Sequence, residues 1–545
     1  EFGHGGNSIP MRQRGSAPVK VNVQDKPIIG SAIGRVLLSF SSLDFFREDL
    51  SSGLNDSSMG GKAAFAYLQS LDFVQADNIA ITGHSMGTWA SWSVAAAFPQ
   101  HKAIVLQCGE VFPLDFYDSD VVKFNNVLLL QAKYDEFDNF RDYGLKVEGL
   151  QNTAVRYRDF MGQDAPVDWN KTYGSFDDGS ARRMQLLITN HRLTTHDGVA
   201  MSTAMDWFST ALGVTSPLAA DDHVYMYKEL LVLIAMFAAL AAMLPLLILL
   251  CRIPFFAEVS QPIAMRAETI FDKRSWWKNA LIAILISAAT YPFLTQLGHG
   301  LFPYPEKLFR MTIGNGVIMW LTFLMIISLV MLIHWFKKGQ GRKMGATLND
   351  LGLASVSMPN TISRSVILKS ALLSIILVAF VYLLLLVSVM FTGLDFRFIW
   401  PFFRPFSLER FGQFLLYLPF YLAFFLINAG IKLYGQMKTS LRNSPAAAQL
   451  AFWGRSVFIM LGGLFIIVLL EYIPFFLGIG PGADLLFGST FGGPFMSILI
   501  LLIPQFIVFY FISAYIYRRT GRVYVGSFVI SMLACWVLSG GSAIF

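Results

Sequence analysis

The distribution of apolar residues divides the 545-residue chain into two parts. Residues 1–213 mix short apolar runs with charged and polar positions, as a globular domain does. Residues 214–229, which include a proline and two neighbouring aspartates, are typical of a linker. Long apolar runs dominate residues 230–545, and this pattern predicts a multi-pass transmembrane domain.

Eight apolar segments in the second part are each long enough to cross a hydrocarbon core of ~30 Å. Prolines interrupt some of them, but neighbouring helices in a membrane can satisfy the backbone groups that a proline frees. We therefore predict an all-α transmembrane domain of about eight helices. The predicted spans are 230–251, 279–298, 313–335, 370–391, 412–431, 456–477, 495–517 and 523–543.

The first part has a different pattern, in which short apolar runs alternate with stretches of helical character. The predicted strands, which are short and apolar, are 79–82, 103–108, 127–131 and 185–189. The predicted helices are 60–70, 88–98 and 199–212. Strands that alternate with helices along a chain predict a parallel α/β sheet.

The most specific motif of the sequence, Gly83-His84-Ser85-Met86-Gly87, lies between a predicted strand and a predicted helix. It fits the G-x-S-x-G pattern of a nucleophile elbow, in which a sharp turn lifts a serine above the sheet. The residues two positions before and after the serine must be small so that strand and helix can approach. The backbone N–H of Met86 would then point at the oxyanion that develops during attack, assisted by the helix N-terminus. Ser85 is therefore the candidate nucleophile.

These features resemble the α/β-hydrolase superfamily of esterases, lipases and peptidases. The resemblance rests on the elbow, on an acid just past a later strand and on a histidine past the final strand, in the chain order Ser, Asp, His. It covers roughly residues 1–215 and implies a serine hydrolase on a mostly parallel sheet with flanking helices. The expected fold class is thus an α/β hydrolase followed by the all-α transmembrane domain.

The glycine-rich opening of the chain, residues 3–8, resembles the G-x-G-x-S loop that follows the fourth strand in many such enzymes, with one extra glycine. On this alignment the chain starts inside the domain. The resemblance then implies that the early strands and the second oxyanion donor precede the chain. It also implies that the chain alone is a partial domain with weak or absent activity.

The chemistry of a serine nucleophile assigns further roles, because Ser85 needs a base and the base needs an orienting carboxylate. Asp135 is the preferred acid because it lies just beyond a predicted strand, and Asp115, past the previous strand, is the alternative. His196, on a loop three residues before the last helix, is the preferred base, and His191, directly after the strand, is the alternative. The histidine beside the nucleophile is expected to pack in the pocket instead.

The composition agrees with a membrane protein and argues against several other classes. The chain is 54% hydrophobic and 14% charged, with a mean hydropathy of +0.53, which is too apolar for a soluble protein. The net charge of +6 is better explained by loops beside a membrane than by a nucleic-acid surface. Cys108, Cys251 and Cys535 are far apart and suggest neither a disulfide framework nor a metal cluster. We expect no nucleic-acid partner, no metal and no organic cofactor.

Lysine and arginine residues alternate strongly between successive loops of the second part. The loops after the first, third, fifth and seventh spans carry 18 of them, among them Lys432, whereas the other loops carry five. Because basic loops face the cytoplasm, the first part and Phe545 are expected on the other side of the membrane. This orientation predicts an export signal or an earlier transmembrane helix upstream.

Two functional hypotheses of different classes follow. The first is a membrane-tethered serine hydrolase that cleaves a carboxylic ester or amide of a small molecule, lipid or peptide through an acyl-enzyme on Ser85. The second is a membrane transport or sensing protein whose α/β domain only binds a ligand. Transport would favour ionisable residues inside the spans, and Glu471 is the only acid well inside one. The sequence therefore favours the hydrolase, anchored or supported by the membrane half.

Overall fold

The computed structural model divides into two compact units by its internal contacts. Unit 1 consists of Glu1–Met226, Leu469–Ser497 and Ile544–Phe545, and unit 2 of Tyr227–Val468 and Ile498–Ala543. The structure describes residues 58, 60–109, 111, 124–137, 147, 160–163, 165–264, 273–301, 308–399, 402–435, 445–480, 482, 486 and 495–542. The glycine-rich opening and the alternative acid Asp115 lie outside these described residues.

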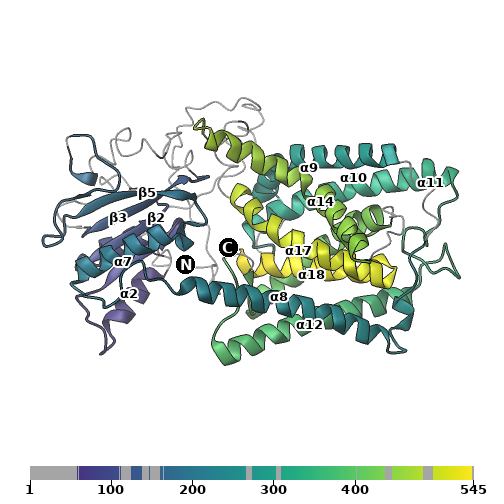
Figure 1. The fold of residues 1–545 in the computed structure, drawn as a ribbon, viewed down its shortest axis with the longest axis horizontal. Helices are drawn as coiled ribbons and strands as arrows, with labels where there is room; N and C mark the ends of the chain where they lie inside the picture. The colour runs from purple at the N-terminus through teal and green to yellow at the C-terminus, as the bar shows by residue number, and fades with distance from the viewer. Residues whose placement is uncertain are drawn as a thin grey trace. The chain divides into compact units, whose positions relative to one another are not determined.

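Unit 1 contains a five-stranded mixed sheet with the strand order β1-β2-β3-β5-β4 (Figure 1). All four predicted strands are present and pair in parallel, and the short β4 pairs antiparallel with β5. The strands are β1 (Ala80–His84), β2 (Ala103–Gln107), β3 (Val127–Tyr134), β4 (Thr172–Tyr173) and β5 (Arg182–Asn190). The helices that pack on the sheet are α2 (Gly61–Gln69), α3 (Met86–Ala97) and α7 (Gly198–Leu212), and they agree with the predicted helices.

Apolar side chains cover both faces of this sheet, as is typical of parallel strands buried on two sides. Along β2, Ile104 and Leu106 belong to one buried cluster, and Ala103 and Val105 belong to the other. Because successive side chains of a strand point to opposite faces, the two clusters lie on opposite faces of the sheet. Helices α2 and α3 pack into the first cluster, and α7 packs into the second.

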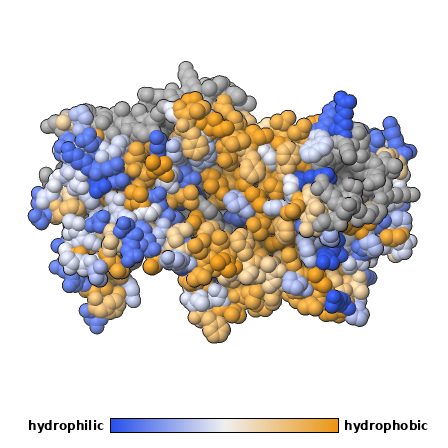
Figure 2. Space-filling view, in the orientation of Figure 1, coloured by the Kyte–Doolittle hydropathy of each residue, from blue (hydrophilic) through white to orange (hydrophobic). Residues whose placement is uncertain are grey.

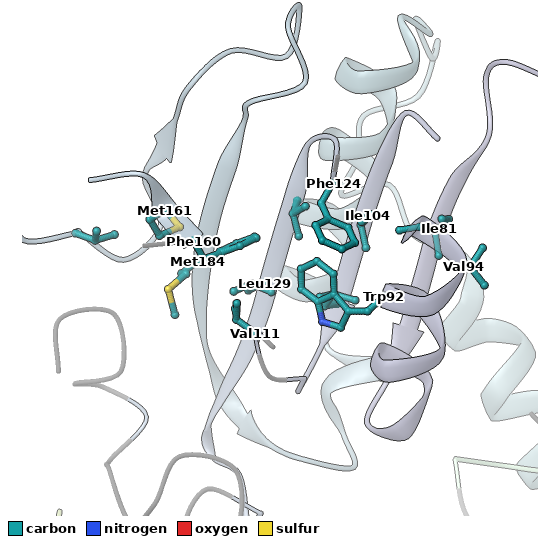
Figure 3. Packing of buried hydrophobic residues seen from close by; sticks show 14 of the residues in the cluster. Ile81, Trp92, Val94, Ile104, Val111, Phe124, Leu129, Phe160, Met161 and Met184 are labelled. Carbon is teal, nitrogen blue, oxygen red and sulfur yellow. The ribbon is translucent and has the colours of Figure 1, made fainter. Parts of the chain in front are cut away.

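One tryptophan anchors a helix on each face. On the first face, Trp92 of α3 is 2% exposed and packs edge-on against Phe124 and Phe160, at ring-centroid distances of 4.7 and 5.8 Å (Figure 3). On the opposite face, Trp207 of α7 donates its indole N–H to the backbone oxygen of Asn126 at 2.8 Å. Edge-to-face aromatic pairs add stability beyond the area that they bury. The Trp92 anchor holds α3, and with it the turn that precedes α3, in place on the sheet.

The described chain also contains eight helices that are long and apolar enough to cross a membrane, as the sequence predicted. The protein is therefore a multi-pass membrane protein by the length and composition of its helices. The helical elements are α8 (Tyr225–Cys251), α9 (Lys273–Leu301), α10 (Thr312–Lys337), α12 (Arg364–Thr392), α13 (Leu408–Phe425) continued by η5 (Leu426–Tyr434), α14 (Pro445–Phe476), α17 (Ser497–Thr520) and α18 (Val523–Gly541).

Helix α18 is the central helix of the membrane part. Its most apolar window is 94% buried, and it packs against α12 and α13. The other spans keep exposed apolar faces, which appear orange on the helical surface in Figure 2. Exposed apolar faces along helices of membrane-spanning length suit contact with lipid.

Glu471, the acid noted inside a predicted span, is fully buried.

Candidate active site

Ser85 occupies the sharp turn between β1 and α3. Its backbone angles are φ 55° and ψ −123°, a conformation that an L-residue other than glycine adopts only under strain. The turn is held in place because the Ser85 N–H donates to the Gln107 backbone oxygen at 3.0 Å, which extends the pairing of β1 with β2. A strained serine at a strand-to-helix turn is the geometry of a nucleophile elbow.

The first glycine of the motif, Gly83, explains why strand and helix can approach so closely. A Cβ atom placed on Gly83 would lie 2.1 Å from the backbone oxygen of Gly87, closer than real Cβ contacts. The helix start is further fixed by Thr88, whose hydroxyl donates to the Ser85 backbone oxygen at 2.7 Å. The requirement for a small residue two positions before the serine therefore follows from the close approach of the Gly87 backbone to Gly83. The Met86 N–H, the predicted oxyanion donor, belongs to the first residue of α3.

Asp135 and His191 form a buried pair at the ends of two neighbouring strands. Asp135 follows β3 and His191 follows β5, and the two side chains are 1% and 2% exposed. The Nδ1 atom of His191 lies 3.0 and 3.1 Å from the two carboxylate oxygens of Asp135. Because a carboxylate can only accept, Nδ1 of the neutral imidazole carries the proton, and Nε2 carries the lone pair. This tautomer is the one that a general base for a serine requires.

The backbone around the pair is fixed by further hydrogen bonds. The His191 N–H donates to Oε2 of Glu136 at 3.1 Å, and the Phe137 N–H donates to Oδ1 of Asp135 at 2.9 Å. The ring of His84, which neighbours the nucleophile, donates from Nε2 to the His191 backbone oxygen at 2.8 Å. His84 therefore links the elbow to the loop of His191.

The strand topology gathers these residues at one edge of the sheet. Ser85, Asp135 and His191 each follow the carboxyl end of a parallel strand, and such ends meet at the same edge. Within the described part of the chain, the Ser85 hydroxyl forms no hydrogen bond. Catalytic hydrogen bonds commonly tighten only when substrate is bound, so the contact between serine and base is expected to close in the complex.

His196, the preferred base from the sequence, has different surroundings. It ends a short 3₁₀ helix, Thr194–His196, and its ring nitrogen Nδ1 lies 3.0 Å from the Thr195 hydroxyl. Its backbone oxygen accepts a hydrogen bond from the Tyr225 hydroxyl at 2.7 Å. The histidine whose ring hydrogen-bonds Asp135 is His191. The geometry thus pairs Asp135 with His191, the alternative base from the sequence.

One group of residues near this edge could hold a metal ion. Ligand atoms of His84, Cys108 and His191 all lie within 4.8 Å of one another. Two imidazoles and a thiolate are a donor set that suits zinc. Serine acyl transfer needs no metal, so the roles assigned to Ser85, His191 and Asp135 do not require an ion at this group.

The buried carboxyl group of Glu136 gives the site a pH-dependent stability. Desolvation, followed by repulsion from Asp135, raises the pKa of Glu136 from 4.5 to about 8. The unfolded chain releases this proton near pH 4.5, whereas the folded chain keeps it up to about pH 8. In that window the unfolded state binds fewer protons, so the free energy of unfolding falls as the pH rises.

We expect Glu136→Gln to remove this part of the pH dependence, because the amide is neutral and still offers an oxygen to the His191 N–H. The measurement is the melting temperature of both proteins from about pH 5 to about pH 9. The wild type should lose more stability than the variant as the pH rises. Parallel curves would contradict the assignment of a proton to Glu136.

Comparison with known proteins found no relative, so any inference about function depends on the geometry described above. No family model matches the sequence, and no curated protein or solved structure matches it.

Proposed function

We propose that unit 1 is a serine hydrolase of the α/β-hydrolase type, which cleaves a carboxylic ester or amide. One observation carries the proposal. A strained serine at a strand-to-helix turn follows one parallel strand of a sheet, while a buried Asp135–His191 pair follows two other parallel strands of the same sheet. Backbone strain of this kind persists where the surrounding structure enforces it, and it clusters at active sites.

The proposed mechanism assigns one role to each residue. As Oγ of Ser85 bonds the substrate carbonyl carbon, Nε2 of His191 takes the hydroxyl proton, and Asp135 stabilises the imidazolium and holds its orientation. The Met86 N–H stabilises the oxyanion. When the tetrahedral intermediate collapses, His191 gives the proton to the departing alcohol or amine. Water then repeats the sequence and releases the acid from Ser85.

The membrane helices support a tethered enzyme with an extracytoplasmic site. The strong excess of lysine and arginine in alternate loops favours a cytoplasmic location for those loops. Unit 1 then faces the opposite side, and its substrate is an external small-molecule ester, a lipid or a peptide. Reaction of an engineered surface cysteine of unit 1 with an impermeant maleimide on intact cells would report this orientation.

The test of the hydrolase is pre-steady-state ester hydrolysis by the purified full-length protein, with any residues that precede Glu1 included. With p-nitrophenyl butyrate we expect a burst of p-nitrophenol equal to the protein concentration, because the acyl-enzyme forms faster than it hydrolyses. Ser85→Ala should abolish both burst and turnover, whereas Ser93→Ala, on the helix that follows, should keep both. Binding of the ester without turnover in the wild type would instead support a ligand-binding domain of a transport or sensing protein.

A further inference from the structure

A mostly apolar cavity with a few polar groups lies within unit 2, far along the chain from the elbow. Its volume is about 110 Å³, and α9, α10, η5 and α14 all contribute side chains to it. Most of the side chains are apolar, such as Leu324 and Ile459. The polar ones include Lys432, Ser328, Trp320 and Ser287. This composition, an apolar wall with a few convergent polar groups, is typical of a ligand site.

Lys432 brings a positive charge to the cavity. Its Nζ atom donates to the Ser328 hydroxyl at 3.1 Å and lies 4.0 Å from the Met331 sulfur. The ion pairs formed among the described residues do not include Lys432, and no aspartate or glutamate lines the cavity. An ionisable residue among membrane helices is costly unless it is paired, so the cavity is complementary to a negative charge.

Two further hydrogen-bonding groups in the cavity lack a partner. The indole Nε1 of Trp320 and the hydroxyl of Ser287 are buried and form no hydrogen bond within the described part of the chain. The two residues are 5% and 6% exposed. An indole N–H can only donate, and a buried donor normally has an acceptor. Together with the ammonium group of Lys432, these groups call for a ligand with several acceptor oxygens.

The backbone at Lys432 is unusual. The sequence placed this lysine in a cytoplasmic loop, but the structure places it in η5, a π-helical segment that continues α13 to Tyr434. π-Helical turns are rare and occur frequently at functional sites. The segment is packed closely, since a Cβ atom on Gly430 would lie 2.6 Å from the Ser527 hydroxyl of α18. The longer helix therefore brings Lys432 into the cavity instead of leaving it in a loop.

We propose that this cavity binds the carboxylate end of a free fatty acid. The carboxylate supplies the negative charge and the acceptor oxygens that Lys432, Trp320 and Ser287 require. The apolar side chains suit the first carbons of the tail, because a cavity of ~150 Å³ holds a benzene molecule and this one is somewhat smaller. The site stands on these residues alone and does not depend on the serine chemistry of unit 1.

The test is photo-crosslinking of the full chain in nanodiscs of neutral phosphatidylcholine, with a diazirine analogue of palmitic acid as the probe. We expect crosslinks on peptides of α9, α10 or η5. Palmitate should compete for them, and hexadecanol, which has the same tail without the charge, should not. Acetate should compete only at far higher concentration. Equal competition by hexadecanol or by acetate would overturn the proposal.

Two variants test whether the polar groups of the cavity bind the probe. Lys432→Met should lower probe affinity by about tenfold or more, and Trp320→Phe, which keeps the ring and removes the N–H, by severalfold. The control is Lys369→Met, because Lys369 pairs with Glu258 at 2.6 Å outside the cavity, and its removal should change nothing. Wild-type affinity in folded Lys432→Met would contradict the site. If that variant fails to fold, wild-type affinity in Trp320→Phe would contradict it.

Discussion

Replacing His191 by alanine is expected to lower kcat for ester hydrolysis by a factor on the order of 10⁶, with little change in KM. The reason is that Ser85 is a weak nucleophile at its own pKa and needs a base to take its proton. His191 is the histidine whose Nδ1 atom hydrogen-bonds the buried carboxylate of Asp135, at 3.0 Å from Oδ1. The measurement is steady-state hydrolysis of a p-nitrophenyl ester by both proteins.

The matched control for this variant is His196→Ala. His196 lies on the same loop, but its ring nitrogen Nδ1 lies 3.0 Å from the Thr195 hydroxyl. Its removal should leave kcat within a few-fold of the wild type. A large loss for His196→Ala together with a small loss for His191→Ala would return the base to His196.

Asp135→Asn is expected to lower kcat by a factor on the order of 10⁴ and to leave the fold intact. The carboxylate accepts the proton on Nδ1 of His191 and so leaves the lone pair on Nε2. An asparagine can instead present its N–H₂ to Nδ1, which moves the imidazole proton to Nε2 and removes the base. The loss should therefore appear in kcat far more than in KM.

The control for Asp135→Asn is the adjacent substitution Glu136→Gln. Glu136 is as deeply buried, and its raised pKa of about 8 keeps it protonated at neutral pH, so the amide resembles its native state. At neutral pH this variant should keep kcat close to the wild type. An equal loss in both variants would mean that any change to this buried corner impairs the site, and it would remove the specific role of Asp135.

The sequence predicted the strands of the sheet well where a strand is marked by its own apolar residues. Buried parallel strands require apolar residues on both faces, and β2 and β3 show this pattern in the sequence itself. The start of β5 was missed because Arg182 and Arg183 resemble a loop. In the structure, the Arg182 guanidinium donates to the Phe124 backbone oxygen at 2.7 Å and lies 5.1 Å above the Phe160 ring. Such contacts depend on tertiary structure and leave no pattern in the sequence.

The choice between the two histidines could not be made from the sequence for a similar reason. Both follow β5 within a few residues, and only the pairing of β3 with β5 brings one of them to Asp135. Asp135 and His191 each lie directly after a strand, and this shared position was the one signal in the sequence that pointed to their pairing. Lys432 was misplaced because its charge suggested a loop, whereas the helix continues through it as η5 and the cavity accommodates the side chain.

The measurement that tests the central claim most directly is covalent labelling of the purified full-length protein, with any residues that precede Glu1 included, with a fluorophosphonate. Such a reagent phosphonylates a serine only when a base has activated it. We predict one label per chain, located by peptide mass spectrometry on Ser85, and no label in Ser85→Ala. A label that persists in Ser85→Ala, or a full-length wild-type protein that takes up no label, would contradict the account.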